Sequence, residues 1–81
     1  MGENMNKNRR QSLRNAIKLL TDASTLIESV CDDEEDALSN TPENLQNTER
    51  YENMENAVDC LNEASDKLDE VMECIEQAIR G

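Results

Sequence analysis

The sequence predicts an all-α protein, a long antiparallel helical hairpin that is expected to dimerise into a four-helix bundle. Apolar residues recur every three or four positions in two long segments, which is the period of a helix. The only proline lies between these segments and interrupts the pattern. The chain has 81 residues, too few to enclose a large core. We therefore expect a single domain that completes its core by association.

The first helix is predicted over residues 8–38, after a polar segment, residues 1–7, that we expect to be flexible. Steps of three and four dominate its apolar pattern, unlike the alternation of a strand. These apolar residues are Leu13, Ala16, Ile17, Leu20, Ala23, Ile27, Val30 and Cys31. The members expected in the oligomer core are Leu13, Ile17, Leu20 and Ile27.

The connection over residues 39–47 contains Pro42, preceded by Thr41. A threonine hydroxyl can accept an orphan backbone N–H, and proline fits the first helical position. We therefore expect a short helical turn here, with Thr41 as its cap. A second helix-start signal follows at Thr48, ahead of the second long helix.

The second helix, predicted over 48–80, carries a heptad pattern typical of a coiled coil. Its steps of four and three run through Met54, Val58, Leu61, Ser65, Leu68, Met72, Ile75 and Ile79. All of these except Ser65 are expected in the oligomer core. A second row, spaced by seven, widens the stripe towards that of a bundle helix and comprises Ala57, Ala64, Val71 and Ala78.

Such wide stripes are not covered inside one hairpin, because a single neighbouring helix hides only one side of each. Pairing two hairpins into four helices buries both rows. A homodimer is therefore the expected state, with a hetero-complex or a larger oligomer as the alternatives.

The composition excludes several classes of function. The formal net charge is −11, Tyr51 is the single aromatic residue, and there is no histidine. The chain therefore lacks a histidine base, a histidine metal ligand and a Gly-rich phosphate loop, so we expect no enzyme and no cofactor. It also lacks aromatic platforms for direct nucleic-acid binding and an apolar run of about 20 residues for a membrane.

Three cysteines, an odd number without a C-x-x-C spacing, favour a reducing compartment and hence the cytoplasm. The acidic run over residues 32–36 lacks the glycine of a calcium loop and the histidines of a di-metal bundle. We expect that run to be a solvated acidic face and not a metal site.

Cations gather at the start of the chain, where residues 1–18 hold five of them and a single acid. In an antiparallel hairpin this segment lies beside the acidic end of the second helix. We expect salt pairing there, within the chain or across a dimer, with a phosphate or anionic-lipid site as the alternative. The candidate basic end consists of Arg9, Arg10, Arg14 and Lys18.

The connection also provides a candidate binding tip. Free N–H groups at helix starts favour anions, an arginine can form a fork onto phosphate, and a tyrosine can stack on a base. The favoured interpretation is nevertheless a structural role. In it Leu45 and Tyr51 fasten the turn, and Arg50 pairs with Glu49 or Glu43. The tip residues are Asn40, Gln46, Thr48, Arg50 and Tyr51.

The stretch from Asp33 to Arg50, followed by Met54 and Glu55, resembles a group of small acidic proteins encoded by bacteriophages, prophages and other mobile elements. The shared pattern is Asn-x-Pro-Glu-x-Leu-Gln-x-Ser/Thr-Glu-Arg, between an acidic helix end and a long second helix. The departures from the group's usual residues are Leu38, Thr41 and Tyr51. The resemblance implies a helical hairpin, phage origin and a bacterial cytoplasm, and it supplies no catalytic residues.

The leading functional hypothesis is a protein-binding module that occupies a host protein, such as a defence component, a replication factor or a transcription factor. The charge of −11 favours a partner with a basic surface. The alternative is an oligomeric binder that sequesters an anionic small molecule, such as a nucleotide immune signal. A purely structural scaffold is a third hypothesis.

Overall fold

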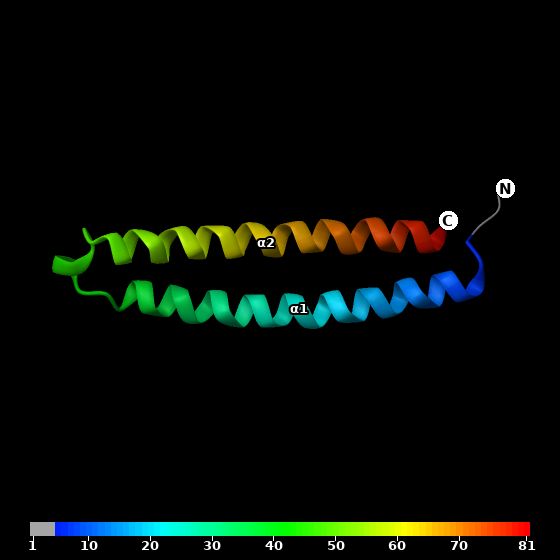
Figure 1. The fold of residues 1–81 in the computed structure, drawn as a ribbon, viewed down its shortest axis with the longest axis horizontal. Helices are drawn as coiled ribbons and strands as arrows, with labels where there is room; N and C mark the ends of the chain where they lie inside the picture. The colour runs from blue at the N-terminus through cyan, green and yellow to red at the C-terminus, as the bar shows by residue number, and fades with distance from the viewer. Residues whose placement is uncertain (1–4) are drawn as a thin grey trace.

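The chain forms an antiparallel helical hairpin, seen in a computed structural model that describes residues 5–81 (Figure 1). Helix α1 spans Lys7–Ser39, a short 3₁₀ helix η1 spans Glu43–Leu45, and helix α2 spans Glu49–Arg80. The described part contains no strand and measures 63 × 18 × 14 Å. The predicted hairpin is therefore confirmed.

The flexible segment predicted over residues 1–7 falls mostly outside the described residues, which begin at Met5. Helix α1 already begins at Lys7, because the side chain of Asn6 caps it and accepts the backbone N–H of Arg9 at 2.8 Å. Helix α2 begins as the sequence predicts. The Thr48 hydroxyl caps it and accepts the backbone N–H of Tyr51 at 3.1 Å.

The connection contains the predicted short helical turn, η1, but the predicted role of Thr41 is wrong. Its hydroxyl donates to the carbonyl oxygen of Ala37 at 2.8 Å and so belongs to the end of α1. The residue before η1 is Pro42, which offers no capping side chain. A threonine that follows a helix has carbonyls four residues back within reach of its hydroxyl, and that local bond prevails here.

The two long helices meet along one seam, which we call the first seam. On α2 it contains every residue of the predicted heptad, and all of them are buried or half-buried. On α1 the same steps of four and three run through Leu13, Ile17, Leu20, Ser24, Ile27, Cys31, Glu34 and Leu38. The residues predicted for an oligomer core thus all lie in the first seam of a single chain.

Contacts across the first seam fix how the helices pair. The Cys31 thiol lies 4.0 Å from the carbonyl oxygen of Val58 and 3.5 Å from Oδ1 of Asn62. Nearer the other end, the Thr21 hydroxyl donates to the sulfur of Met72 at 3.6 Å. Among residues 5–81, only Ser24, Cys31 and Val58 are buried, and each keeps a few per cent of its surface exposed. The core of one chain is therefore very small.

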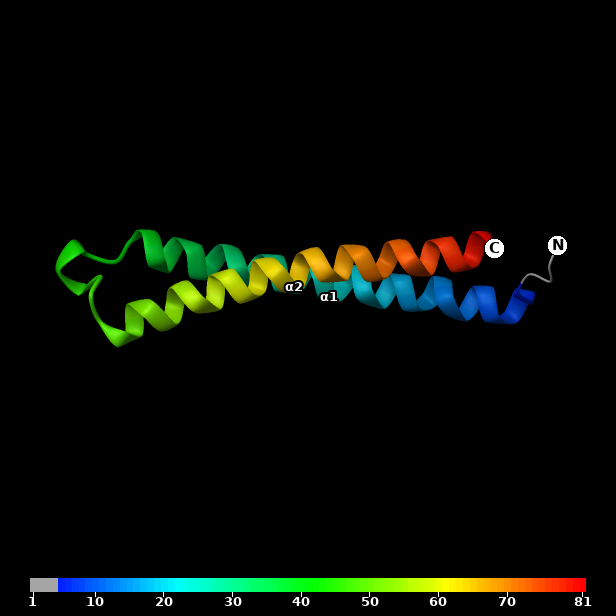
Figure 2. The same cartoon turned by 90° about the horizontal axis from the view of Figure 1, so that it is seen from above.

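Part of the sequence of α1 recurs in α2, and the two segments align without an insertion or a deletion. The segment Leu20–Val30, LTDASTLIESV, corresponds to Leu61–Val71, LNEASDKLDEV, 41 residues later. The shared Ala-Ser pairs place Ser24 and Ser65 near the midpoints of α1 and α2. The helices cross near these midpoints (Figure 2). Small side chains at a crossing allow the two backbones to approach closely.

Candidate functional site

The tip of the hairpin holds a groove of about 430 Å³ between the end of α1 and the start of α2. Four of the five predicted tip residues line it together: Asn40, Thr48, Arg50 and Tyr51. The fifth, Gln46, does not line the groove, because its amide donates to the carbonyl oxygen of Thr41 at 3.3 Å and fastens the connection. The structure therefore brings most of the predicted tip into one place.

The floor of the tip groove is apolar, and its rim carries one cation. Pro42, Leu45 and Met54 line it beside the half-buried ring of Tyr51. Arg50 is exposed, and no carboxylate oxygen among residues 5–81 lies within 4 Å of its guanidinium nitrogens. The expected pairing of Arg50 with a neighbouring glutamate is thus not formed. This arrangement can hold a flat, anionic group against an apolar surface.

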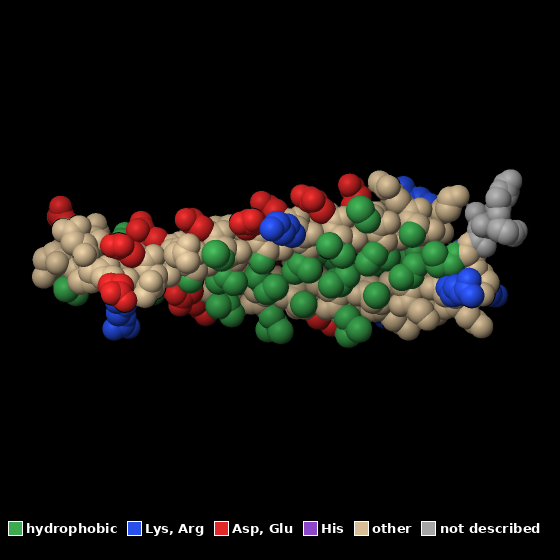
Figure 3. Space-filling view, turned by 45° about the horizontal axis from the view of Figure 1, so that its top comes forward, with side chains coloured by type: hydrophobic (Ala, Val, Ile, Leu, Met, Phe, Trp, Pro, Cys, Tyr) green, Lys and Arg blue, Asp and Glu red, His purple; other side chains and the backbone are tan. Residues whose placement is uncertain are grey.

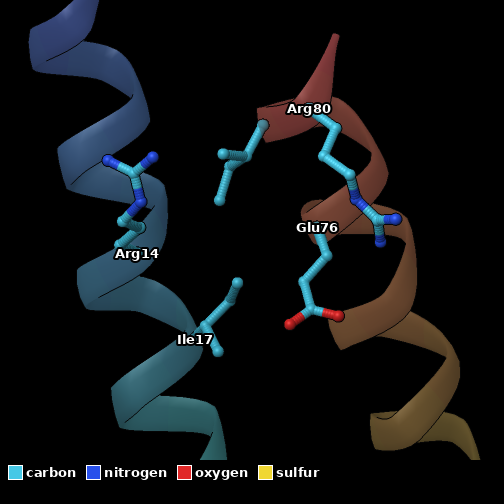
Figure 4. Close-up of a pocket in the computed structure, with 5 residues that line it drawn as sticks. Arg14, Ile17, Glu76 and Arg80 are labelled. Atoms are coloured by element: carbon cyan, nitrogen blue, oxygen red, sulfur yellow. The ribbon is translucent and has the colours of Figure 1, made fainter.

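The opposite end of the hairpin has a second groove, of about 480 Å³, between the start of α1 and the end of α2 (Figure 4). Arg14 lies on one side of it, and Glu76 and Arg80 lie on the other. The sequence did not predict the participation of Arg80. In Figure 4 the Glu76 carboxylate points towards α1, whereas the guanidinium of Arg80 points away from Arg14. Any anion entering the groove would therefore meet the carboxylate of Glu76.

The other residues of the predicted basic end do not converge on that groove. Arg9 borders a separate hollow beside Met5, and Lys18 borders another beside Asp22. Arg10 is half-buried, and its Nε atom has no hydrogen-bond partner in the described part of the chain. The basic end is therefore a dispersed set of cations and not one built site.

Within residues 5–81, the expected salt pairing of the basic end with the acidic end of α2 is not formed. The start of α1 does lie beside the end of α2 (Figure 1). However, the ion pair found within residues 5–81 lies elsewhere. It joins Lys67 Nζ to Glu63 Oε2 at 3.1 Å, and these two residues are one turn apart on α2. Exposed charges gain little free energy from pairing, since water solvates them well. Apart from Glu63, the acids of α2 form no ion pair within residues 5–81.

An exposed apolar surface was predicted only in part from the sequence. Leu19, Leu26 and Val30 of α1 are 70%, 68% and 52% exposed, and Val71 of α2 is 44% exposed. Neither Leu19 nor Leu26 belongs to the predicted stripes. Two signals in the sequence identify Leu19 and Leu26. They are spaced by seven, and each follows an alanine, Ala16 or Ala23, by three residues, which places it on the same side of the helix as that alanine.

We call this surface the second seam. On α1 its steps of three and four run through Ala16, Leu19, Ala23, Leu26, Val30, Asp33 and Ala37. The internal repeat places the same steps on α2, through Ala57, Cys60, Ala64, Lys67, Val71, Cys74 and Ala78. On one face of the hairpin, hydrophobic side chains of both helices form a continuous band (Figure 3).

The three cysteines are free thiols in different surroundings. Cys60 and Cys74 are exposed, whereas Cys31 is buried in the first seam. Burial raises the pKa of the Cys31 thiol, and the carboxylates of Glu35 and Asp32 raise it further. In the described residues, no three Cys, Asp or Glu side chains converge as metal ligands. Neither described helix is long and apolar enough to cross a membrane.

No family model, curated protein or solved structure matches this chain. The surfaces through which the chain could act are the tip groove, the groove at the basic end, the acidic exterior and the second seam.

Proposed function

We propose that this chain is a non-catalytic protein-binding module of a bacteriophage or mobile element. In this proposal it acts in the bacterial cytoplasm, where it occupies the basic surface of a host protein. The proposal rests on the acidic exterior of the hairpin, and the resemblance of the connection to phage-encoded proteins agrees with it.

The observation that carries the proposal is a row of unpaired acids along α2, which we call the acidic ridge. Its members are spaced by seven, are all exposed, and comprise Glu52, Asp59, Asp66 and Glu73. None of them takes part in an ion pair within residues 5–81. Residues seven apart on a helix lie about 10 Å from one another along its axis. The ridge therefore presents a straight line of negative charge.

A line of fixed carboxylates suits a partner whose lysines and arginines are arranged to contact a linear anion. Surfaces that bind nucleic acid have this property, because they track a phosphate backbone. The net charge of −11 steers such a partner towards the hairpin and speeds their encounter. Occupying that surface would block the partner's own ligand, and this is how a chain without catalytic residues can act.

Affinity capture from a lysate of the bacterial host tests this proposal. The tagged chain is expected to retain a host protein at low salt and to release it as salt is added, because screening weakens exposed charges. A ridge variant carrying Asp59→Asn, Asp66→Asn and Glu73→Gln should lose that protein.

The matched control removes three acids from α1 instead, through Asp22→Asn, Asp32→Asn and Asp36→Asn. It lowers the net negative charge equally and should keep most of the binding. Retention that is indifferent to salt, or equal loss in both variants, would contradict a role for the ridge.

The tip groove favours a second candidate function, the binding of an anionic small molecule such as a nucleotide. Asn40, Arg50 and Tyr51 line this groove of about 430 Å³ above an apolar floor. A base could stack on the ring of Tyr51 while the guanidinium of Arg50 binds a phosphate.

A thermal-shift screen against a panel of nucleotides tests the second candidate. Binding should raise the melting temperature saturably, since the ligand stabilises the folded state by mass action. Arg50→Ala should abolish that rise, whereas Asn53→Ala, on the same helix but outside the groove, should retain it. No response across the panel leaves the protein-binding function as the sole proposal.

A further inference from the structure

We infer that the second seam is covered by a second copy of this chain, so that two hairpins form a four-helix bundle. This inference is independent of the proposed partner and of the acidic ridge. It concerns what hides the apolar side chains that the single hairpin leaves in water, including Leu19 and Leu26, which are 70% and 68% exposed.

The two seams of each helix point in directions that fit a bundle. With about 100° per residue, the centres of the first and second seams also lie about 100° apart around the helix axis. Each helix of a four-helix bundle contacts neighbours about 90° apart. The first seam is filled by the other helix of the hairpin. The second seam therefore lacks only the neighbouring pair of helices.

The internal repeat places the two second seams on the same face of the hairpin. An antiparallel pair of equivalent helices is related by a two-fold axis that runs between them, perpendicular to the plane containing both. A rotation about that axis exchanges α1 with α2 but leaves each face of the hairpin on its own side. Val30 of α1 and its equivalent on α2, Val71, therefore lie on the same face. An occupant of this face must therefore contact both helices along their length, as another hairpin does.

The charges also allow two acidic chains to meet on this face. Although the chain carries 19 acids, the second-seam positions of both helices include one acid, Asp33, and one cation, Lys67. The amine of Lys67 lies 3.1 Å from Glu63. The remaining acids of α1 and α2 occupy other positions, so two copies can join here without pressing rows of like charge together.

The size of the face is sufficient for a stable dimer. The hairpin is 63 Å long and 18 Å wide, so one broad face offers on the order of 1,000 Å², against roughly 800 Å² per partner in a standard interface. The need for cover is equally clear, because in the described residues the core of one chain is limited to Ser24, Cys31 and Val58.

The second copy is favoured over a foreign helix by the repeat itself. Helix α2 is a version of the pattern in α1, and the two already pack antiparallel in the hairpin. Two versions of this helix pattern therefore already pack on each other through their first seams. A second copy is also present wherever the chain is made, so its folding does not depend on another protein.

Melting at several concentrations tests the inference on the native chain. In a dimer the melting temperature should rise between about 1 and about 100 micromolar, because association is coupled to folding. Cys60 and Cys74 belong to the second seam and should react slowly with a thiol reagent, although both are exposed in a single hairpin. Dilution should speed their reaction.

Two variants on neighbouring positions locate the interface. Leu26→Glu places a charge in the second seam and should lower the melting temperature and its dependence on concentration. Thr25→Glu adds the same charge at an exposed position outside that seam and should leave both unchanged. A native melting temperature that is independent of concentration, together with fast reaction of Cys60 and Cys74, would overturn the inference. That result would leave the proposal for the acidic ridge intact.

Discussion

At the scale of single residues, Cys31 shows how a small core depends on protonation. Its thiol is buried among Val58 and Asn62, beneath two carboxylates of the same helix turn. The charged thiolate is disfavoured there, so the pKa of Cys31 is raised. The folded state therefore holds the thiol proton more tightly than the unfolded state does.

This raised pKa predicts a loss of stability at alkaline pH. The contribution of Cys31 is complete below the usual thiol pKa of about 8.5, and it is lost as the pH rises through the raised value. Urea denaturation of the native chain and of Cys31→Ala, at neutral and alkaline pH, measures it. The stability advantage of the native chain should shrink as the pH rises. An advantage that grows with pH would contradict this sign.

Ser24 is buried at the midpoint of α1, where the helices cross, and a larger side chain should force them apart. We expect Ser24→Leu to lower the free energy of unfolding by about 1–3 kcal/mol, the usual range for overpacking. Ser29→Leu, at an exposed position on the same helix, is the control and should change it by less than about 0.5 kcal/mol. Equal effects in urea denaturation would argue against a close crossing.

At the scale of elements, the sequence predicted both long helices to within one residue of their starts, because periodicity and end signals are local. The predicted capping role of Thr41 was wrong. Its hydroxyl can accept a backbone N–H of the following turn or donate to the carbonyl oxygen of Ala37, and which bond forms depends on distances that only the folded turn sets. The convergence of the tip residues was predictable from the hairpin. The dispersal of the basic end was not, because long side chains in water have no fixed partner.

The cap of α2 gives a prediction at this scale. Thr48→Ala removes the acceptor of the Tyr51 N–H and should lower the free energy of unfolding by about 1 kcal/mol. Thr25→Ala, in the middle of α1 and outside any cap, should leave stability unchanged or slightly higher, since alanine favours helix. Chemical denaturation of both variants measures the difference. Equal stabilities would show that the start of α2 does not depend on this hydroxyl.

At the scale of the whole molecule, charge and apolar surface occupy different sides of each helix. Local periodicity revealed the first seam and the alanine and valine row of the second seam on α2, but Leu19 and Leu26 of α1 join that seam only when α1 and α2 are compared as repeats. The structure shows that Leu19 and Leu26 of the second seam are exposed on a single hairpin. The net charge of −11 opposes the association of two copies and at the same time attracts a basic partner.

Salt should therefore act in opposite directions on folding and on partner binding. Raising the concentration of sodium chloride from about 0.05 M to about 0.5 M should raise the melting temperature of the isolated chain, because it screens repulsion among the acids. The same change should release a captured basic partner. A melting temperature that falls with salt would show that favourable ion pairs, and not repulsion, dominate the electrostatics of folding.

In the bundle that we propose, two copies of this chain cover each other's second seam. Sedimentation equilibrium of the untagged native chain at about 10 micromolar, a concentration at which coupled association should be complete, tests it most directly. We predict a mass about twice the 9.2 kDa of one chain. A compact species of 9.2 kDa that melts cooperatively would contradict the claim.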